Sequence, residues 1–294
     1  MNGKRVITLA TMIAFLLFGL AKLLFTDIKA EYAQPERKDL VVKVLDVGQG
    51  DAIVLFCGKD TILVDSSDTD MKSRLIELLR RENIKTIDLL VATHPHEDHI
   101  GGMQEVIKNF TVKKILDSGK EHTTRVYREY LEIIRKKKIP FVKAKKGNIY
   151  TFDKGVSLEV LWPGEKFLSN TNSDLNNNSI VLKVKKEDFS MLLTGDIEKE
   201  AEQQLVKEFS GKLGSNVLKS PHHGSYRSST NAFLREVSAQ AVIISCGKDN
   251  EYGFPHKDVM KRYKNNGMQI YVTAADGSVT VTTDGKKYQI KKDR

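Results

Sequence analysis

Cysteine is scarce in this chain. Its 294 residues include only Cys57 and Cys246, which is too few for a disulfide framework. Each falls in or beside a predicted strand, where we expect a free thiol to act as a small apolar side chain, although an exported protein could pair the two. No cysteine follows the apolar segment near the N-terminus, which excludes a lipid-modified cysteine at that point.

Long apolar runs are equally rare. The run Val6–Ala21 follows Lys4 and Arg5, a pattern typical of a signal peptide. It approaches the roughly 20 residues that span a bilayer, so a cleaved signal and an uncleaved membrane anchor both remain open. The preceding cations favour the cytoplasmic side. We therefore expect a secreted protein, or one anchored to the outer face of the cytoplasmic membrane, built from three parts: a signal or anchor, a linker and one large domain, residues 1–30, 31–38 and 39–294.

Acidic residues are fewer than basic ones. The chain has 47 Lys and Arg against 38 Asp and Glu, a formal net charge of +9. Such a field favours anionic partners such as nucleic acid or lipid headgroups, and a merely soluble basic surface accounts for it about equally well. The basic runs, such as Arg135–Lys138, contain no interleaved aromatic residues, so they do not form a base-stacking platform.

The apolar pattern predicts an α/β fold. Turn residues separate short apolar runs that read as strands, and helical spacing of apolar residues follows them. This order occurs in two similar halves, which favours two sheets packed face to face with helices outside. The main predicted strands are 40–47, 52–56, 61–64, 87–92, 157–162, 179–184 and 189–194, and the clearest predicted helices are 71–82, 99–110 and 124–138.

One loop concentrates metal-ligand chemistry. His94, His96, Asp98 and His99 fall within six residues, directly after the buried strand 87–92. Imidazole and carboxylate groups suit zinc, iron or manganese, and strand ends are where α/β sheets place their sites. The loop therefore predicts a metal site.

Other predicted strand ends carry further ligands. Asp196 ends the segment Leu193–Asp196, His222 and His223 lie in a turn after another strand, and His256 follows a third. Strand ends converge on one edge of a sheet, so the chain offers enough ligands for two metal ions that share a carboxylate. That arrangement serves in-line displacement at phosphorus.

These motifs resemble those of a known family. Asp65, His94-x-His96-x-Asp98-His99, Gly195-Asp196 and the late His256 are similar to the motifs of the metallo-β-lactamase superfamily, over about residues 39–285. Three further segments resemble the hydrolase domain of ComEC-type DNA-uptake proteins: 45–52, 221–225 and 252–256. With a single apolar segment, the chain resembles a stand-alone relative without an integral-membrane competence domain.

The resemblance implies a four-layer αββα sandwich and a hydrolase with two divalent metal ions, zinc or manganese. By motif, His94 and His96 hold the first ion, Asp98 and His99 hold the second together with His256, and Asp196 bridges them. A metal-bound hydroxide is then the nucleophile, with Asp98 in the catalytic set. Asp65 orients a ligand histidine, or else caps the turn that follows it.

The His222-His223 turn resembles the extra histidine motif of phosphodiesterases in this superfamily. That resemblance implies that His222 contacts the scissile phosphate, stabilises developing charge or protonates the leaving oxygen. His223, Ser225 and Asn178 are expected to bind substrate, and a structural role for His223 is equally open.

One histidine usual in the superfamily is absent between His122 and His222, where Asn176–Ser179 stands instead. An asparagine oxygen, His222 or substrate has to complete the first metal site, which favours manganese over zinc.

We therefore expect a metal-dependent phosphodiesterase, a nuclease acting on DNA outside the cytoplasm. Its partners are DNA or another phosphodiester, and the membrane if the N-terminal segment stays uncleaved. Two alternatives remain: a hydrolase of small molecules such as β-lactams or thioesters, and a DNA-binding protein with a degraded metal site.

Overall fold

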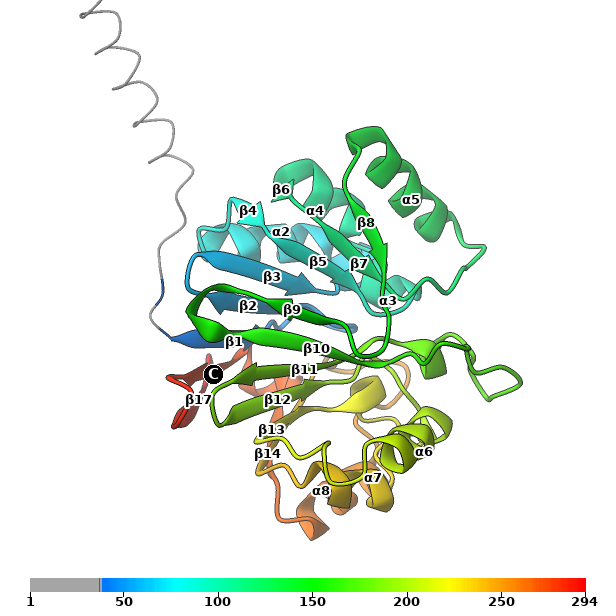
Figure 1. The fold of residues 1–294 in the computed structure, drawn as a ribbon, viewed down its shortest axis with the longest axis vertical. Helices are drawn as coiled ribbons and strands as arrows, with labels where there is room; N and C mark the ends of the chain where they lie inside the picture. Colours follow the sequence, from blue (N-terminus) through cyan, green and yellow to red (C-terminus); the bar gives the residue numbers. More distant parts are fainter. Residues whose placement is uncertain (1–36, 38) are drawn as a thin grey trace, which may run out of the picture. The chain divides into compact units, whose positions relative to one another are not determined.

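Two β-sheets stacked face to face form the centre of the molecule (Figure 1). The computed structural model describes residues 37 and 39–294. The first sheet has eight strands, which run in hydrogen-bonded order β17 (Tyr288–Lys292), β16 (Val279–Thr283), β1 (Leu40–Val44), β2 (Ile53–Cys57), β3 (Asp60–Val64), β5 (Leu89–Ala92), β7 (Ile115–Asp117) and β8 (Phe141–Lys143).

The second sheet has seven strands, in the order β15 (Gln269–Val272), β14 (Ala241–Ile244), β13 (Val217–Lys219), β12 (Phe189–Leu193), β11 (Val181–Lys186), β10 (Ser157–Trp162) and β9 (Ile149–Thr151). A separate two-stranded pair joins β4 (Thr86–Ile87) and β6 (Thr111–Val112). Short 3-10 turns are η1 (Thr69–Met71), η2 (Asp153–Gly155), η3 (Asn176–Asn178) and η4 (Pro221–Gly224).

Helices cover both outer faces (Figure 1). The first sheet is covered by α2 (Lys72–Arg81), α4 (Met103–Asn109) and α5 (Arg125–Lys137), and the second by α6 (Lys199–Glu208), α7 (Asn231–Val237) and α8 (Lys257–Asn265). Two short helices are α3 (Glu97–Ile100) and α9 (Thr273–Asp276). The predicted four-layer αββα sandwich is therefore confirmed.

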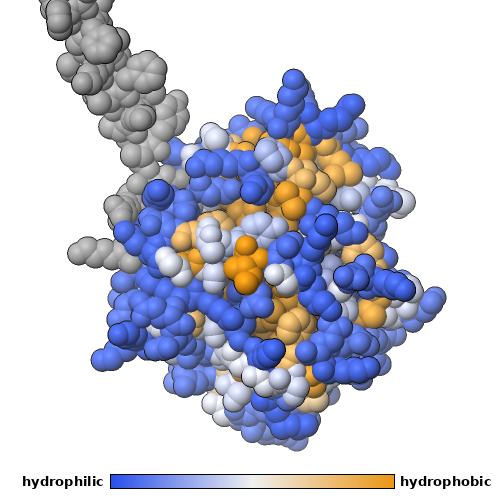
Figure 2. Space-filling model, in the orientation of Figure 1, coloured by the Kyte–Doolittle hydropathy of each residue, from blue (hydrophilic) through white to orange (hydrophobic). Residues whose placement is uncertain are grey.

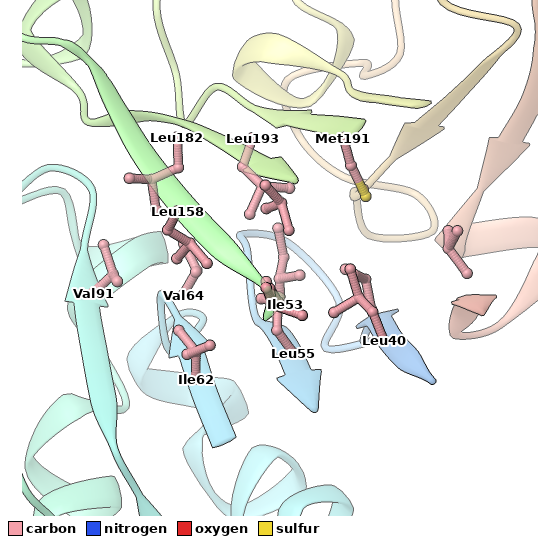
Figure 3. Close-up of a cluster of buried hydrophobic side chains, with 14 of the residues drawn as sticks. Leu40, Ile53, Leu55, Ile62, Val64, Val91, Leu158, Leu182, Met191 and Leu193 are labelled. Carbon is pink, nitrogen blue, oxygen red and sulfur yellow. The ribbon is translucent and has the colours of Figure 1, made fainter. Parts of the chain in front are cut away.

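The largest apolar cluster lies between the sheets. Figure 3 shows Leu158 and Leu182 of the second sheet facing Ile62 and Val64 of the first. Strands such as β2 are buried along their whole length, because helices cover the face that the other sheet does not. That double burial explains why these strands read as continuous apolar runs in the sequence.

Parallel pairing places the functional loops at one edge. The strands β3, β5 and β7 pair in parallel, and so do β12, β13 and β14. The carboxyl ends of parallel strands meet at the same edge of a sheet. The loops after these six strands therefore meet near α3, at the right of Figure 1.

One predicted helix is interrupted. We expected residues 99–110 to be continuous, and the structure divides the segment into α3 and α4 around Gly101 and Gly102. A Cβ atom on Gly102 would lie 2.3 Å from the carbonyl oxygen of Ser66, so the break lets the metal-ligand loop pack directly against the chain that follows β3.

Two sequence-based expectations concern other parts of the chain. Cys57 and Cys246 are buried free thiols, and burial raises the pKa of Cys246 to about 11. Among residues 37 and 39–294, no helix is long and apolar enough to cross a membrane. The run Val6–Ala21, on which the expected signal or anchor depends, lies outside the described residues.

We expect mutations in the core between the sheets to lower the free energy of unfolding strongly. Leu55 is fully buried there, so Leu55→Ala should lower the free energy of unfolding by about 2–5 kcal/mol. Urea unfolding of the full chain measures this. Figure 2 shows a mostly hydrophilic face with a few hydrophobic residues at its middle. Ile149 on β9 is 61% exposed, and Ile149→Ala should change stability by less than about 0.5 kcal/mol. Equal effects would contradict this packing.

A buried carboxyl group joins α6 to the start of α7. Glu202 accepts hydrogen bonds from the backbone N–H groups of Ser229 and, at 2.8 Å, Thr230. Burial raises the pKa of Glu202 to about 7, although these hydrogen bonds oppose the shift. The folded state therefore holds this proton more tightly than the unfolded chain does.

This shift predicts a pH-dependent stability. A raised carboxyl pKa means that the folded state is favoured below the unfolded pKa and loses stability as pH rises towards 7. Relative to Glu202→Gln, the unmodified protein should lose about 3 kcal/mol of unfolding free energy between about pH 4 and pH 8. Urea unfolding across that range measures the difference, and parallel pH profiles would contradict it.

Candidate metal centre

The carboxylate of Asp196, just after β12, is the meeting point of four histidines. Its Oδ2 lies 3.2 Å from Nε2 of His99 and 3.3 Å from Nε2 of His223. Nε2 of His94 and of His222 each lie 3.9 Å from the same oxygen. Two of these histidines come from the loop after β5 and two from the turn after β13, so the site joins the two sheets.

Four side chains form a compact ligand group. Asp98, His99, Asp196 and His223 each offer an atom, and these atoms all lie within 4.8 Å of one another. His223 donates from Nδ1 to the carbonyl oxygen of Ser245 at 2.8 Å, which leaves Nε2 free to bind a metal. Imidazole nitrogens and carboxylate oxygens in this number fit zinc or manganese.

Asp65 fixes the orientation of His99. Its Oδ2 accepts a hydrogen bond from His99 Nδ1 at 2.8 Å, and its two oxygens also accept from the N–H and hydroxyl of Thr93. Nε2 of His99 is thereby turned towards Asp196. The geometry matches the orienting role that the resemblance implied for Asp65, and the hydrogen bonds to Thr93 hold the start of the loop.

A second set of ligands lies beside the first. Nε2 of His94 is 3.0 Å from Nδ1 of His96 and 3.9 Å from Oδ2 of Asp196, and His96 lines the pocket. Asn176 lines that pocket. Its Oδ1 and Oδ1 of Asp196 are both buried and have no hydrogen-bond partner. Buried polar atoms are almost always paired, so unpaired amide and carboxylate oxygens on residues that line the same pocket as His96 fit the coordination of a cation.

The two sets differ in charge. Burial lowers the pKa of His94 and of His96, so both are neutral, as a metal ligand must be. Burial also lowers the pKa of His223, but Asp196 and Asp98 outweigh it and raise the value to about 10, so a metal ion that binds Nε2 would have to displace a proton. Burial raises the pKa of Asp196, and His223, His99 and His222 together bring it well below its usual range.

The two histidines of the turn η4 point to different places. His222 and His223 both adopt left-handed backbone conformations, with φ of 48° and 53°, each of which costs about 1–3 kcal/mol in a non-glycine residue. His223 enters the ligand group. His222 lines the pocket, with its Nδ1 3.3 Å from Oε1 of the buried Glu198.

The structure does not bring His256 into the ligand group. Its Nδ1 accepts a hydrogen bond from the N–H of Tyr226 at 3.2 Å, and its ring lies 5.2 Å from that of Phe254. His223 stands beside Asp98 and His99 where we had expected His256. The left-handed turn, which sequence spacing does not reveal, is what carries His223 inward.

Two expected substrate-binding residues have other partners. Asn178 donates to the carbonyl oxygens of Leu168 and Asp174, so its side chain organises the loop before η3. The hydroxyl of Ser225 accepts from the N–H of Arg227. The pocket is reached instead by Asn176, because the tight turn of η3 sends successive side chains in different directions.

Sequence reasoning missed a buried ion pair behind the site. Lys219 Nζ lies 2.7 Å from Asp51 Oδ2, and both side chains are buried. The other oxygen of Asp51 is 3.6 Å from Nδ1 of His223. The backbone N–H of Asp51 also donates to the carbonyl oxygen of Asp98. A buried lysine at a strand end next to histidines was the available signal.

The site opens into a pocket of about 680 Å³. Metal-ligand candidates form its floor, and acidic residues also line it: Asp68, Asp70, Glu97 and Glu251. Tyr252 and Phe254 contribute aromatic surface. The pocket can therefore admit a substrate that presents one phosphate or acyl group to the ligand group.

Comparison with known proteins identifies the class. A model of the metallo-beta-lactamase superfamily matches residues 45–248, so the chain belongs to this superfamily of metal-dependent hydrolases. The metallo-beta-lactamase fold protein YhfI of Bacillus subtilis aligns with a TM-score of 0.52 at 11% identity, covering 83% of this chain and 100% of that one. This likeness supports the fold.

Within the class, the chain is similar to competence proteins. ComE operon protein 3 of Bacillus subtilis is 28% identical over 258 residues, which are 81% of this chain and 32% of that protein. Competence protein ComA of Neisseria gonorrhoeae is 29% identical over 248 residues, covering 84% and 33%. The expected ComEC-type resemblance is confirmed, and the chain spans about a third of the length of these curated relatives.

Gly50 allows the loop before β2 to touch the site. A Cβ on Gly50 would lie 2.0 Å from the carbonyl oxygen of Asp98. Gly50→Ala should therefore displace Asp98 and weaken Mn²⁺ binding about ten-fold, measured by titration calorimetry. Gly147→Ala is the matched control, because Gly147 also has a positive φ but nothing within 4 Å. Equal Mn²⁺ affinities of the two variants would contradict the contact.

Proposed function

We propose that this protein is a metal-dependent phosphodiesterase that cleaves DNA. The observation that carries the proposal is the pair of adjacent histidines in η4: His223 joins the ligand group, while His222 faces the pocket beside it, backed by Glu198. One histidine then serves the metal, and the other is free for the substrate.

Two divalent ions fit the ligand sets. Asp98, His99, Asp196 and His223 would hold one ion, and His94 and His96 would hold the other with the oxygens of Asn176 and Asp196. Bound there, divalent ions would lower the pKa of water and offset the charge of a phosphate. The oxygen of Asn176 stands where the superfamily's usual histidine is absent, and this oxygen-richer set favours manganese.

His222 is placed to act on the substrate. Its side chain is 18% exposed, while the carboxylate of Glu198 behind it is 1% exposed. The carboxylate of Glu198 lies 3.3 Å from Nδ1, which leaves Nε2 as the ring nitrogen that can reach a substrate. Nε2 of His222 can then donate a hydrogen bond to a phosphate oxygen or protonate the leaving oxygen.

DNA is the substrate that the relatives and the charge favour. The curated relatives named above are competence proteins, and the chain carries a net charge of +9. We further propose that it acts outside the cytoplasm, on the strength of Lys4, Arg5 and the apolar run Val6–Ala21. Fusion to alkaline phosphatase, which is active only after export, tests that location: an inactive fusion overturns it.

Incubation with DNA tests the reaction. The full chain should degrade labelled DNA with Mn²⁺ or Zn²⁺ and stop with EDTA. Asp98→Ala should abolish cleavage, because it removes a charged ligand. His222→Ala should slow cleavage about 10²–10⁴-fold and leave the metal content, measured by plasma mass spectrometry, unchanged.

His122→Ala is the control for His222. His122 accepts a hydrogen bond from the N–H of Thr124 before α5 and should tolerate removal with activity within about two-fold. Absence of any metal-dependent cleavage would contradict the phosphodiesterase proposal. Loss of metal together with activity in His222→Ala would make His222 a ligand instead.

A further inference from the structure

A row of aromatic rings leads out of the pocket. Tyr252 stacks on Phe254 with ring centroids 5.3 Å apart and planes 17° apart. His256 lies 5.2 Å beyond Phe254, and Tyr226 lies 5.0 Å beyond His256. Within the row, the ring of Phe254 is 5.6 Å from that of His222. The row therefore passes beside the residue placed to act on the substrate.

Both terminal rings are open to solvent. Tyr252 is 54% exposed and Tyr226 is 56% exposed, among the few large hydrophobic side chains exposed in the described part of the chain. Stacking on Phe254 fixes the plane of Tyr252 and leaves more than half of the residue uncovered. Large exposed aromatic rings beside a site are typical of ligand contact rather than of packing.

The loop that carries the row is rigidly held. The side chain of Asn250 donates to the carbonyl oxygens of Gly247 and Phe254 and accepts from the N–H of Phe254. At the other end, the N–H of Tyr226 donates to His256. The rings are thus preorganised, so a ligand binds without first ordering them.

Cations accompany the outer end of the row. The guanidinium of Arg227 lies 5.7 Å from the ring centroid of Tyr226, and Arg262 donates to the carbonyl oxygen of Tyr226. The lining of the pocket is acidic, through Asp68, Asp70 and Glu97. The arginines therefore attract an anionic strand to the outer end of the row. A second backbone would approach the acidic residues and would be repelled by them.

We propose that the aromatic row, Tyr252, Phe254, His256 and Tyr226, binds the unpaired bases of single-stranded DNA and delivers its backbone to the metal centre. This inference rests on the proposed phosphodiesterase function. Every base has a π-face, so stacking on exposed rings binds a strand without reading its sequence. A duplex buries those faces between its own base pairs and brings a second backbone towards the acidic lining.

Binding without metal tests the row. The full chain in EDTA is titrated with fluorescein-labelled oligothymidylate, with an abasic oligomer of equal length and with a hairpin duplex, followed by anisotropy. Tyr252→Ala and Tyr226→Ala should each weaken oligothymidylate binding about ten-fold. Tyr252→Phe and Tyr226→Phe keep the rings and should stay within about two-fold. Phe141→Ala, at an exposed ring on β8, should have no effect.

Binding of the abasic oligomer and of the duplex should be equally weak in every variant. Unchanged oligothymidylate affinity in both alanine variants would overturn the proposal, and so would an equal loss on the abasic oligomer or tighter binding of the duplex. The nuclease assay separates the two proposals. Cleavage without ring-dependent binding refutes the row alone, whereas ring-dependent binding without cleavage refutes the phosphodiesterase and leaves the row supported.

Discussion

The architecture depends on one buried carboxylate, Asp196, surrounded by imidazoles from both halves of the chain. Charge removed from water is costly unless opposite charge or a metal compensates it. Nitrogens of His99 and His223 supply that compensation within 3.3 Å of one oxygen, and nitrogens of His94 and His222 lie 3.9 Å from the same oxygen. Because two of these residues follow β5 and two follow β13, the carboxylate can be satisfied only when the two sheets are correctly stacked.

The surroundings of this carboxylate are built to keep each ring in one orientation. Asp65 fixes Nδ1 of His99, and the carbonyl oxygen of Ser245 fixes Nδ1 of His223, so in both rings the opposite nitrogen points inward. Strain accompanies that arrangement, since Asp65, His222 and His223 all adopt left-handed φ values. Non-glycine residues hold such conformations only where neighbouring contacts impose them, and here these contacts are the ligand-orienting ones.

Local motifs predicted much of this site, and long-range geometry decided the rest. The spacing of His94, His96, Asp98 and His99 identified four of the seven candidate ligands, because these four occupy one loop after one strand. The strand-end rule also indicated Asp196 and the η4 turn. It could not distinguish His223 from His256, since it gives the edge of a sheet and not the direction of a side chain. For the same reason, the rule did not indicate that Asn176 rather than Asn178 lines the pocket. The layers of the fold were predictable from doubly buried strands, whereas the break at Gly102 depended on a contact with Ser66.

The acidic lining of the pocket explains why a nucleic-acid ligand would need the aromatic row for binding. The lining residues Asp68, Asp70 and Glu97 are acidic, so the pocket alone does not attract a polyanion, and in the proposed reaction bound metal ions would have to supply the attraction for the phosphate. The basic runs of the sequence contain no aromatic residues. The fold nevertheless assembles rings from Tyr226 and from 252–256 beside His222. If the protein binds DNA as proposed, affinity for the bases and attraction for the phosphate come from different groups. Stacking does not release counterions, whereas neutralising phosphates does. Binding carried by the rings would therefore depend less on salt than binding carried by lysine and arginine, and the proposed single-strand preference would follow from the rings rather than from net charge.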